Sequence, residues 1–180
     1  SEMCIRDSST CDLNLLWNEP STAGLILILT FGPHAYNIST PLVFDNTTLA
    51  SEVRLIGNAS TVLRAPNASG TMSLVTMHPG APPLTLTGIT LEGGRVDVRG
   101  ASLTLESCAL EGGHSLTDGG AASVRDGGQL EAHQTSFRQN TADRNGGAIA
   151  LDGSHTELDD CLIEGNTAVE RGGGVHARNS

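Results

Sequence analysis

Four stretches of the chain share one pattern of apolar positions. Residues 84–94, 103–113, 130–140 and 156–166 read LTLTGITLEGG, LTLESCALEGG, LEAHQTSFRQN and TELDDCLIEGN. Apolar residues recur at the first, third, sixth and eighth positions, with mostly polar or small residues between them. Alternation with a period of two indicates a strand, and the interruption at positions 4 and 5 indicates a bend. Each stretch therefore predicts two short strands joined by a bend.

A second pattern starts at each pair of glycines. The pairs begin at Gly93, Gly119, Gly146 and Gly172, at intervals of 26, 27 and 26 residues. Alternation resumes after each pair, which predicts a third strand with one face inside and the other in water. Three strands per 25–27 residues at a nearly fixed period predict stacked rungs, each covering the apolar face of the next. The predicted fold class is an all-β parallel β-helix, a solenoid.

The repeat divides the chain into a regular and an irregular part within one domain. The regular rungs occupy residues 84–180 and are placed at 84–102, 103–129, 130–155 and 156–180. Residues 12–83 are expected to hold a first strand and irregular early coils, and residues 1–11, which fit no repeat, a non-native or disordered leader. The last rung ends without an amphipathic cap. We therefore expect a fragment of a longer solenoid whose open end favours end-to-end self-association.

Two short motifs in the regular rungs resemble a known repeat. Residues 137–140 read FRQN and residues 146–149 read GGAI, with looser copies at 163–166 and 172–175. These are similar to the FxxN and GGAI elements of polymorphic outer-membrane protein repeats, and the wider pattern resembles right-handed, pectin-lyase-like β-helices. The resemblance implies a right-handed helix that is exposed at a cell surface or outer membrane.

Composition narrows the classes of partner. The chain has 20 acidic and 10 basic residues, a formal net charge of −10, and such a surface would repel nucleic acid. The longest apolar stretch, residues 23–31, is shorter than the ~20 residues of a membrane-spanning helix, so we expect no transmembrane segment in this sequence. Aromatic residues make up 3% of the chain, which argues against a groove that stacks sugar rings. We expect no cofactor. Ca²⁺ is the ion that an acidic surface could still bind.

The register of the repeat places certain polar side chains inside the helix. Position 6 carries Cys108, Thr135 and Cys161 on successive rungs, and we expect them to stack as an interior column. Rungs lie ~4.8 Å apart, which puts the two cysteines about 9–10 Å apart, beyond the reach of a disulfide. Position 11 carries Asn140 and Asn166, whose amides are expected to form a ladder along the axis.

The bend between the first two strands gives the best candidate for a catalytic site. Position 4 brings Glu106, His133 and Asp159 to one edge on successive rungs, and Asp160 follows at position 5. Glu106 and Asp159 would lie two rungs apart, near the ~6.5–9.5 Å carboxyl separation of inverting glycoside hydrolases. A polysaccharide lyase or glycoside hydrolase, or a remnant of one, is therefore the alternative function. Bends also carry solvated polar residues for reasons of turn chemistry alone.

Further residues are candidates for metal binding or modification. Asp118, Asp143 and Asp152 lie beside glycine or near a turn, where they could hold Ca²⁺ between loops. Four asparagines lie in Asn-x-Ser/Thr sequons, the acceptors of N-glycosylation: Asn37, Asn46, Asn58 and Asn67. Two further cysteines, Cys4 and Cys11, lie in the leader, and a disulfide through Cys11 requires that this residue is native.

The loops between the two patterns vary more than the strands. They read HSLTD at 114–118, TADRN at 141–145 and TAVER at 167–171. Variable loops on a rigid scaffold are where binding usually lies. The sequence therefore predicts a non-catalytic, extracellular or cell-surface scaffold with an adhesive or structural role, whose loops meet an unknown protein or glycan.

Overall fold

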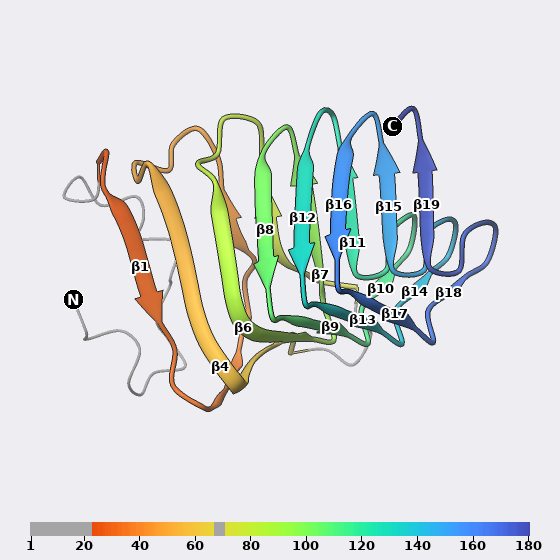
Figure 1. Cartoon of the computed structure of the whole chain (residues 1–180), viewed down its shortest axis with the longest axis horizontal. Coiled ribbons are helices and arrows are strands. Elements are labelled where there is room, and N and C mark those ends of the chain that lie inside the picture. The colour runs from red at the N-terminus through yellow and green to blue at the C-terminus, as the bar shows by residue number, and fades with distance from the viewer. Residues whose placement is uncertain (1–22, 67–70) are drawn as a thin grey trace.

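The computed structural model describes residues 23–66 and 71–180 as a solenoid of parallel strands. All elements in these two ranges are strands, and none is a helix. The chain advances along one axis while it winds, so segments far apart in the sequence lie side by side (Figure 1). The fold is a right-handed parallel β-helix, which confirms the fold class predicted from the repeat.

Three parallel sheets, here named A, B and C, wrap the axis. Sheet A contains β1 (Ile26–Thr30), β2 (Ala35–Asn37), β4 (Glu52–Arg64), β6 (Leu84–Glu92), β8 (Ser102–Glu106), β9 (Ala109–Glu111), β12 (Gln129–His133), β13 (Ser136–Arg138), β16 (His155–Asp159) and β17 (Leu162–Glu164). Sheet B contains β3 (Leu42–Phe44), β5 (Ser73–Met77), β7 (Arg95–Arg99), β11 (Ala122–Arg125), β15 (Ile149–Asp152) and β19 (Val175–Arg178). Sheet C contains β10 (His114–Ser115), β14 (Thr141–Ala142) and β18 (Thr167–Ala168).

The regular rungs that start at residues 103, 130 and 156 each have four strands, where the sequence pattern predicts three, and the rung at 84–102 has β6 and β7 alone. The two strands of the apolar pattern and the strand after the glycine pair form as predicted. The fourth is a two-residue strand that begins each variable loop, and these short strands together make sheet C. The loops at 114–118, 141–145 and 167–171 therefore stack in register at their start.

The strand register matches the predicted interior positions. Leu103 of β8 pairs with Leu130 of β12, which in turn pairs with Thr156 of β16. Positions 1, 3, 6 and 8 are buried in the three rungs that start at residues 84, 103 and 130. Their side chains join one hydrophobic core with the inward residues of sheet B. In the rung that starts at Thr156, the last of the described rungs, the same positions are half-buried.

The bends of sheet A are set by the backbone at position 5. This position has a positive φ between 50° and 66° in every regular rung: Gly88, Ser107, Gln134 and Asp160. A left-handed backbone costs a residue with a Cβ about 1–2 kcal/mol. Hydrogen bonds between rungs offset this cost, since Ser107 N donates to His133 O at 2.9 Å and Gln134 N donates to Asp159 O at 2.9 Å.

The early coils are less regular than the later ones. The strand-like segments around Glu52 and Ser60 join in β4, which is 13 residues long and pairs with β1, β2 and β6. The register of β4 with β6 shifts between Ile56 and Thr61. Gly57 permits the shift, because a Cβ at this residue would lie 2.7 Å from the Thr61 Cβ.

Candidate functional site

The edge predicted to hold acidic and histidine side chains is a solvated ridge. Glu106, His133 and Asp159 are the last residues of β8, β12 and β16, and they pair in register. His133 Nδ1 lies 3.6 Å from Asp159 Oδ2, and the Glu106 carboxylate accepts a hydrogen bond from Thr87 at 3.0 Å. Glu106, Asp159 and the neighbouring Asp160 are all exposed. The register thus brings the three side chains together in open water.

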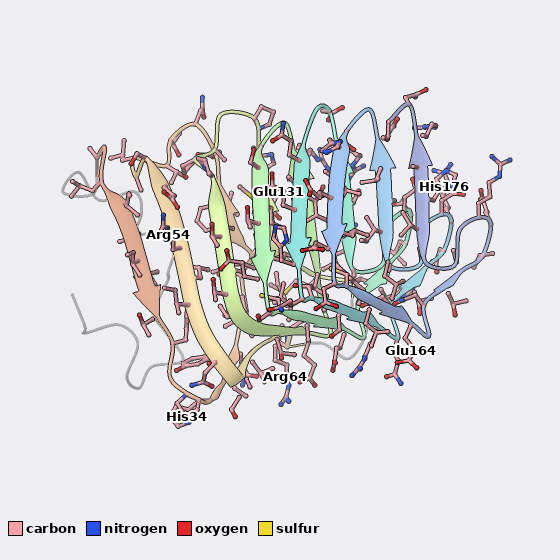
Figure 2. All side chains as sticks on the ribbon, viewed as in Figure 1. His34, Arg54, Arg64, Glu131, Glu164 and His176 are labelled. Carbon is pink, nitrogen blue, oxygen red and sulfur yellow. The ribbon has the colours of Figure 1, made fainter. Side chains whose placement is uncertain are left out.

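Other side chains on the outer face of sheet A are equally open. Arg54 and Glu131 project away from the ribbon, and both are exposed (Figure 2). General acid catalysis by a carboxyl group usually relies on burial or a neighbouring charge to raise its pKa. Nothing in the surroundings of Glu106 or Asp159 encloses either carboxylate.

The candidate calcium ligands each have a partner of their own. The pairs are Asp118 with Asn145, Asp143 with His114, and Asp152 with Arg178. No group of three or more His, Cys, Asp or Glu that could hold a metal ion occurs in the part of the chain that the structure describes. Calcium binding by Asp118, Asp143 and Asp152 stays a prediction.

Three of the four sequon asparagines lie on the surface. Asn37, Asn46 and Asn58 are exposed, as a glycan acceptor must be. Asn67 lies outside the described residues, and so do Cys4 and Cys11. Glycosylation at these asparagines stays a prediction.

The interior column of position 6 is hydrogen-bonded to the backbone. Cys108 N donates to Thr135 Oγ1 at 3.2 Å, and Cys161 Sγ donates to Ala132 O at 3.2 Å. Both Cys108 and Cys161 are free thiols. Burial raises the pKa of Cys108, so this thiol is protonated at neutral pH and is a poor nucleophile.

The asparagines of position 11 satisfy the backbone at the turn after β13 and β17. Asn140 Nδ2 and Asn140 N both donate to Asn166 Oδ1 at 2.9 Å. Asn140 Oδ1 accepts from Gly113 N at 2.9 Å, and Asn166 Nδ2 donates to Phe137 O at 2.8 Å. Each amide therefore links its own rung to a neighbouring one.

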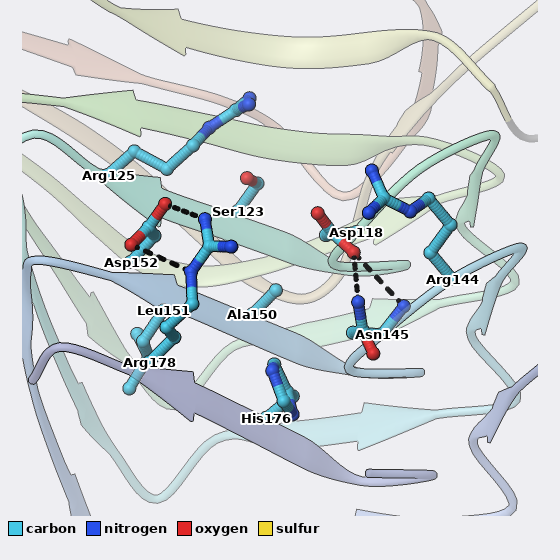
Figure 3. Close-up of a pocket in the computed structure, with 10 residues that line it drawn as sticks. All are labelled: Asp118, Ser123, Arg125, Arg144, Asn145, Ala150, Leu151, Asp152, His176 and Arg178. Atoms are coloured by element: carbon cyan, nitrogen blue, oxygen red, sulfur yellow. Dashed lines mark hydrogen bonds and ion pairs between the residues drawn. The ribbon is translucent and has the colours of Figure 1, made fainter. Parts of the chain in front are cut away.

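A cleft of about 270 Å³ lies on the outer face of sheet B, beside the loops (Figure 3). We call it the arginine cleft. Its floor consists of Ser123, Ala150 and His176, which occupy equivalent positions in β11, β15 and β19. Ser123 and Ala150 are small, so the outward side of the sheet is hollow at these two rungs. The residues at the exposed edge of sheet A, Glu106, His133 and Asp159, do not line this cleft.

The loops after β10 and β14 build one wall of the arginine cleft. Asp118, Arg144 and Asn145 line it from this side. Asn145 donates to Asp118 Oδ1 twice, from its backbone N at 3.1 Å and from its Nδ2 at 2.8 Å. This double contact ties one loop to the next and holds the wall in place.

The ends of the sheet B strands build the opposite wall. Arg125, Asp152 and Arg178 line it, and they occupy one column of the parallel register. Arg178 Nε donates to Asp152 Oδ1 at 3.2 Å, and a second bond joins the Arg178 Nη2 to Asp152 Oδ2 (Figure 3). The two walls carry three arginines and two aspartates, and each arginine faces a carboxylate: Arg125 faces Asp97, Arg144 faces Glu170 and Arg178 faces Asp152.

A buried ion pair lies beside the cleft, one rung earlier. Asp97 pairs in register with Ser123 of the floor and is only 5% exposed. Arg125 Nη2 donates to both Asp97 oxygens at 3.1 and 3.3 Å, and Arg99 Nη2 donates at 3.3 Å. Burial alone would raise the pKa of Asp97, but the two arginines outweigh it and hold the pKa below its ordinary value. The carboxylate is therefore ionised at neutral pH.

Two buried polar atoms of the cleft walls have no hydrogen-bond partner. Within residues 23–66 and 71–180, the buried side-chain N and O atoms without a partner are Arg95 Nε, Arg125 Nε and Asn145 Oδ1. Arg125 and Asn145 line the cleft from opposite walls. Unpaired buried polar atoms cost about 1–3 kcal/mol each, so these atoms lower the stability of the two walls.

The sequence contains a signal for the arginine cleft that motif reasoning missed. In the register set by the glycine pairs, Arg99, Arg125, Asp152 and Arg178 share one outward position. The neighbouring outward position carries Asp97 and then the small residues Ser123 and Ala150. Alignment of the outward residues would have found the charged column and the small floor. It would not have found the loop wall, whose position depends on the fold.

Comparison with known proteins identifies one repeat. Residues 134–152 match the Chlamydia polymorphic membrane protein (Chlamydia_PMP) repeat. The match spans residues 137–140 and 146–149, so it confirms the likeness first seen in the FRQN and GGAI motifs. The repeat indicates a surface or outer-membrane protein. No curated protein and no solved structure matches the chain. Among the described residues, no helix has the length and apolar character needed to cross a membrane.

Proposed function

We propose that this chain is a cell-surface scaffold whose rigid β-helix presents three stacked loops to a partner. The loops are residues 114–118, 141–145 and 167–171, and we call their shared surface the loop ridge. The repeat match at residues 134–152 supports a location at an extracellular or outer-membrane surface. The adhesive or structural role rests on the geometry of the ridge.

The loop ridge is a continuous and well-connected surface. Backbone bonds run between successive loops: Asp143 N donates to Ser115 O at 2.9 Å, and Val169 N donates to Ala142 O at 3.1 Å. Side chains add further links, with Arg144 Nε lying 3.8 Å from the Glu170 carboxylate. A preorganised surface binds at a lower entropic cost than free loops do.

The observation that carries the proposal is a pair of apolar side chains at the tips of the loops. Leu116 is 66% exposed and Val169 is 72% exposed, and they occupy the third position of the first and third loops. The middle loop carries Asp143 at the same position. Large apolar side chains held in water on a rigid ridge favour contact with a partner.

No observation favours the enzyme alternative. Its candidate residues Glu106, His133, Asp159 and Asp160 lie on the solvated ridge of sheet A. The described chain has few aromatic side chains to stack on sugar rings, and the arginine cleft lies on another face.

Attachment of chain-coated beads to cultured cells tests the scaffold function. Beads coated with the wild-type chain should be retained, and the double variant Leu116→Ser with Val169→Ser should lower retention about tenfold, as expected when anchor side chains are removed. Treating the cells with protease or with glycosidase beforehand separates a protein partner from a glycan partner.

The matched control is Ile28→Ser, which removes a similarly exposed apolar side chain from β1. Its beads should be retained as well as wild type. If the tip variant and wild type are retained equally, the loop ridge is not the binding surface. If wild-type beads are retained on no cell, the protein has no adhesive role.

A further inference from the structure

The loop wall of the arginine cleft, formed by Asp118, Arg144 and Asn145, contains a chemically labile site. Asn145 and Gly146 are the only Asn-Gly pair in the sequence. Asparagine is thermolabile, and a following glycine leaves the next backbone nitrogen without a neighbouring Cβ. We propose that Asn145 is a deamidation site that the fold keeps closed, and that its deamidation separates loop 141–145 from loop 114–118. The inference goes beyond the scaffold function, because it concerns the chemical lifetime of the loops and not what they bind.

The reaction needs no reagent except water. Gly146 N loses its proton and attacks Asn145 Cγ, and the new C–N bond closes a succinimide ring. The side-chain nitrogen of Asn145 takes up that proton and leaves as ammonia. Water then opens the ring at one of its two C–N bonds. Breaking the new bond gives an aspartate, and breaking the original backbone bond gives an isoaspartate.

Hydrogen bonds between rungs hold both reacting groups. Gly146 N donates to Arg171 O at 2.9 Å. Asn145 donates to Asp118 Oδ1 twice, from Nδ2 at 2.8 Å and from its backbone N at 3.1 Å. Asn145 Oδ1 is buried without a hydrogen-bond partner among the described residues, so Asp118 is what fixes the amide. The attack therefore requires Gly146 N to leave Arg171 O and the Asn145 amide to leave Asp118.

Local opening of the loop wall sets the rate of the reaction. The two residues before Asn145, Asp143 and Arg144, are exposed. Exposed loops open at a lower free-energy cost than buried strands do. The deamidation rate of the folded chain is therefore the rate of the unfolded chain multiplied by the fraction of time that the wall is open.

Deamidation removes a donor that joins the two loops. The aspartate product has no Nδ2, and its carboxylate would face Asp118 Oδ1, which lies 2.8 Å from Asn145 Nδ2. Like charges this close repel each other. The isoaspartate product takes the Asn145 carbonyl out of the backbone, so Gly119 N loses the acceptor that it contacts at 2.9 Å. Either product thus breaks a link between loops 114–118 and 141–145.

Peptide mapping by mass spectrometry tests the proposal on the full chain, kept at mildly alkaline pH in buffer or in urea. Deamidation of Asn145 should be at least about tenfold slower in buffer than in urea, because only the open fraction reacts. In urea Asn145 should deamidate faster than Asn46 and Asn58, whose following residues carry a Cβ.

Asp118→Ala tests whether Asp118 keeps the site closed. In buffer this variant should deamidate at Asn145 about tenfold faster than wild type, as expected when hydrogen bonds to a charged group are lost. In urea the two rates should be equal, because the contact exists only in the folded chain. The matched control is Asp159→Ala, which removes an exposed carboxylate from sheet A and should react as wild type does in both solutions.

Asn145→Asp reproduces one product and tests its effect on the loops. Amide hydrogen exchange in residues 114–120 should be about tenfold faster in this variant than in wild type, because the loop wall opens more often. The matched control is Asn58→Asp, which makes the same change at an exposed asparagine of β4 and should leave this exchange unchanged.

Each opposite outcome overturns the proposal. Equal rates in buffer and urea would show that the fold does not shield Asn145, and a faster reaction of another asparagine in urea would place the labile site elsewhere. An unchanged rate in Asp118→Ala, or unchanged exchange in Asn145→Asp, would show that the contact with Asp118 neither closes the site nor joins the loops. If Asp118→Ala lacks the wild-type circular dichroism spectrum, the wild-type rates and the exchange of Asn145→Asp decide the result. The bead assay is independent, because retained beads alongside a failed rate comparison would refute this inference and leave the scaffold function standing.

Discussion

The outer faces of sheets A and B are built on the same parallel register, and the arginine cleft lies on sheet B. Sheet A aligns Glu106, His133 and Asp159 on an open ridge. Sheet B aligns Ser123 and Ala150 between two walls. The difference is the loop wall, which borders sheet B and supplies one side of the cleft. A repeat therefore aligns residues on every face, but a column becomes a site only where loops enclose it.

The largest effect is expected from a substitution that fills the space between two successive rungs beside the loops. A Cβ on Gly147 would lie 2.1 Å from Gly173 O and 2.6 Å from Thr167 N, both backbone atoms of the next rung. Gly147→Ala should therefore lower the free energy of unfolding by about 3–5 kcal/mol, since the backbone must shift. Urea denaturation followed by circular dichroism measures the loss.

Gly173→Ala is the matched control for this prediction. Gly173 occupies the equivalent position one rung later, and a Cβ there would meet only Asn166 O, at 3.3 Å. Its substitution should cost less than about 1 kcal/mol. Equal losses in the two variants would contradict the view that the next rung is what requires glycine at Gly147.

The second prediction compares one aspartate from each face. Asp97→Ala removes the carboxylate that Arg99 and Arg125 share and should destabilise the protein by about 2–3 kcal/mol, a value reduced because the arginines are partly exposed. Asp159→Ala removes an exposed carboxylate 3.6 Å from His133 and should change stability by less than about 0.5 kcal/mol. The free energies of unfolding of both variants, measured at pH 7, check this. A larger loss at Asp159 would mean that the sheet A ridge is the structured site.

The third prediction follows the same aspartate through pH and has the smallest effect. The pKa of Asp97 is lowered in the folded chain, so protons bind the unfolded state first as pH falls. The stability that Asp97 contributes is full above the unfolded pKa of about 3.9 and is lost as pH drops through the lower folded pKa. The stability gap between wild type and Asp97→Asn should therefore be constant between about pH 5 and 7 and shrink below about pH 4. A gap that widens on acidification would contradict the ion pair.

Much of the fold was predictable because the interior repeats strictly. The apolar period fixed the register that pairs Leu103 with Leu130, and it placed Thr135 beside Cys108. The same register set Asn140 next to Asn166. Each of these contacts joins residues at the same position of adjacent rungs, so the period of the repeat alone determines them.

The remainder depends on contacts that no period encodes. Sheet C was missed because His114–Ser115 and its two equivalents are only two residues long and become strands only by pairing with one another. The arginine cleft was missed because its depth depends on where the loops lie relative to sheet B. The acidic ridge was the more visible pattern, since charged and histidine residues stand out in a sequence, whereas the small floor residues Ser123 and Ala150 do not.

The first regular rung has no variable loop, and this has a consequence for how such proteins diversify. Gly94 leads directly into β7, and that rung starts 19 residues before the next one, against 27 for its successor. In the second rung the loop leaves and returns at one point, since a Cβ on Gly113 would lie 2.4 Å from Gly120 O and 2.7 Å from Gly94 O. A whole loop can therefore be inserted or deleted between two glycines without moving any strand. Changes in loop length at this corner would alter the exposed surface and leave the strands of the β-helix unchanged.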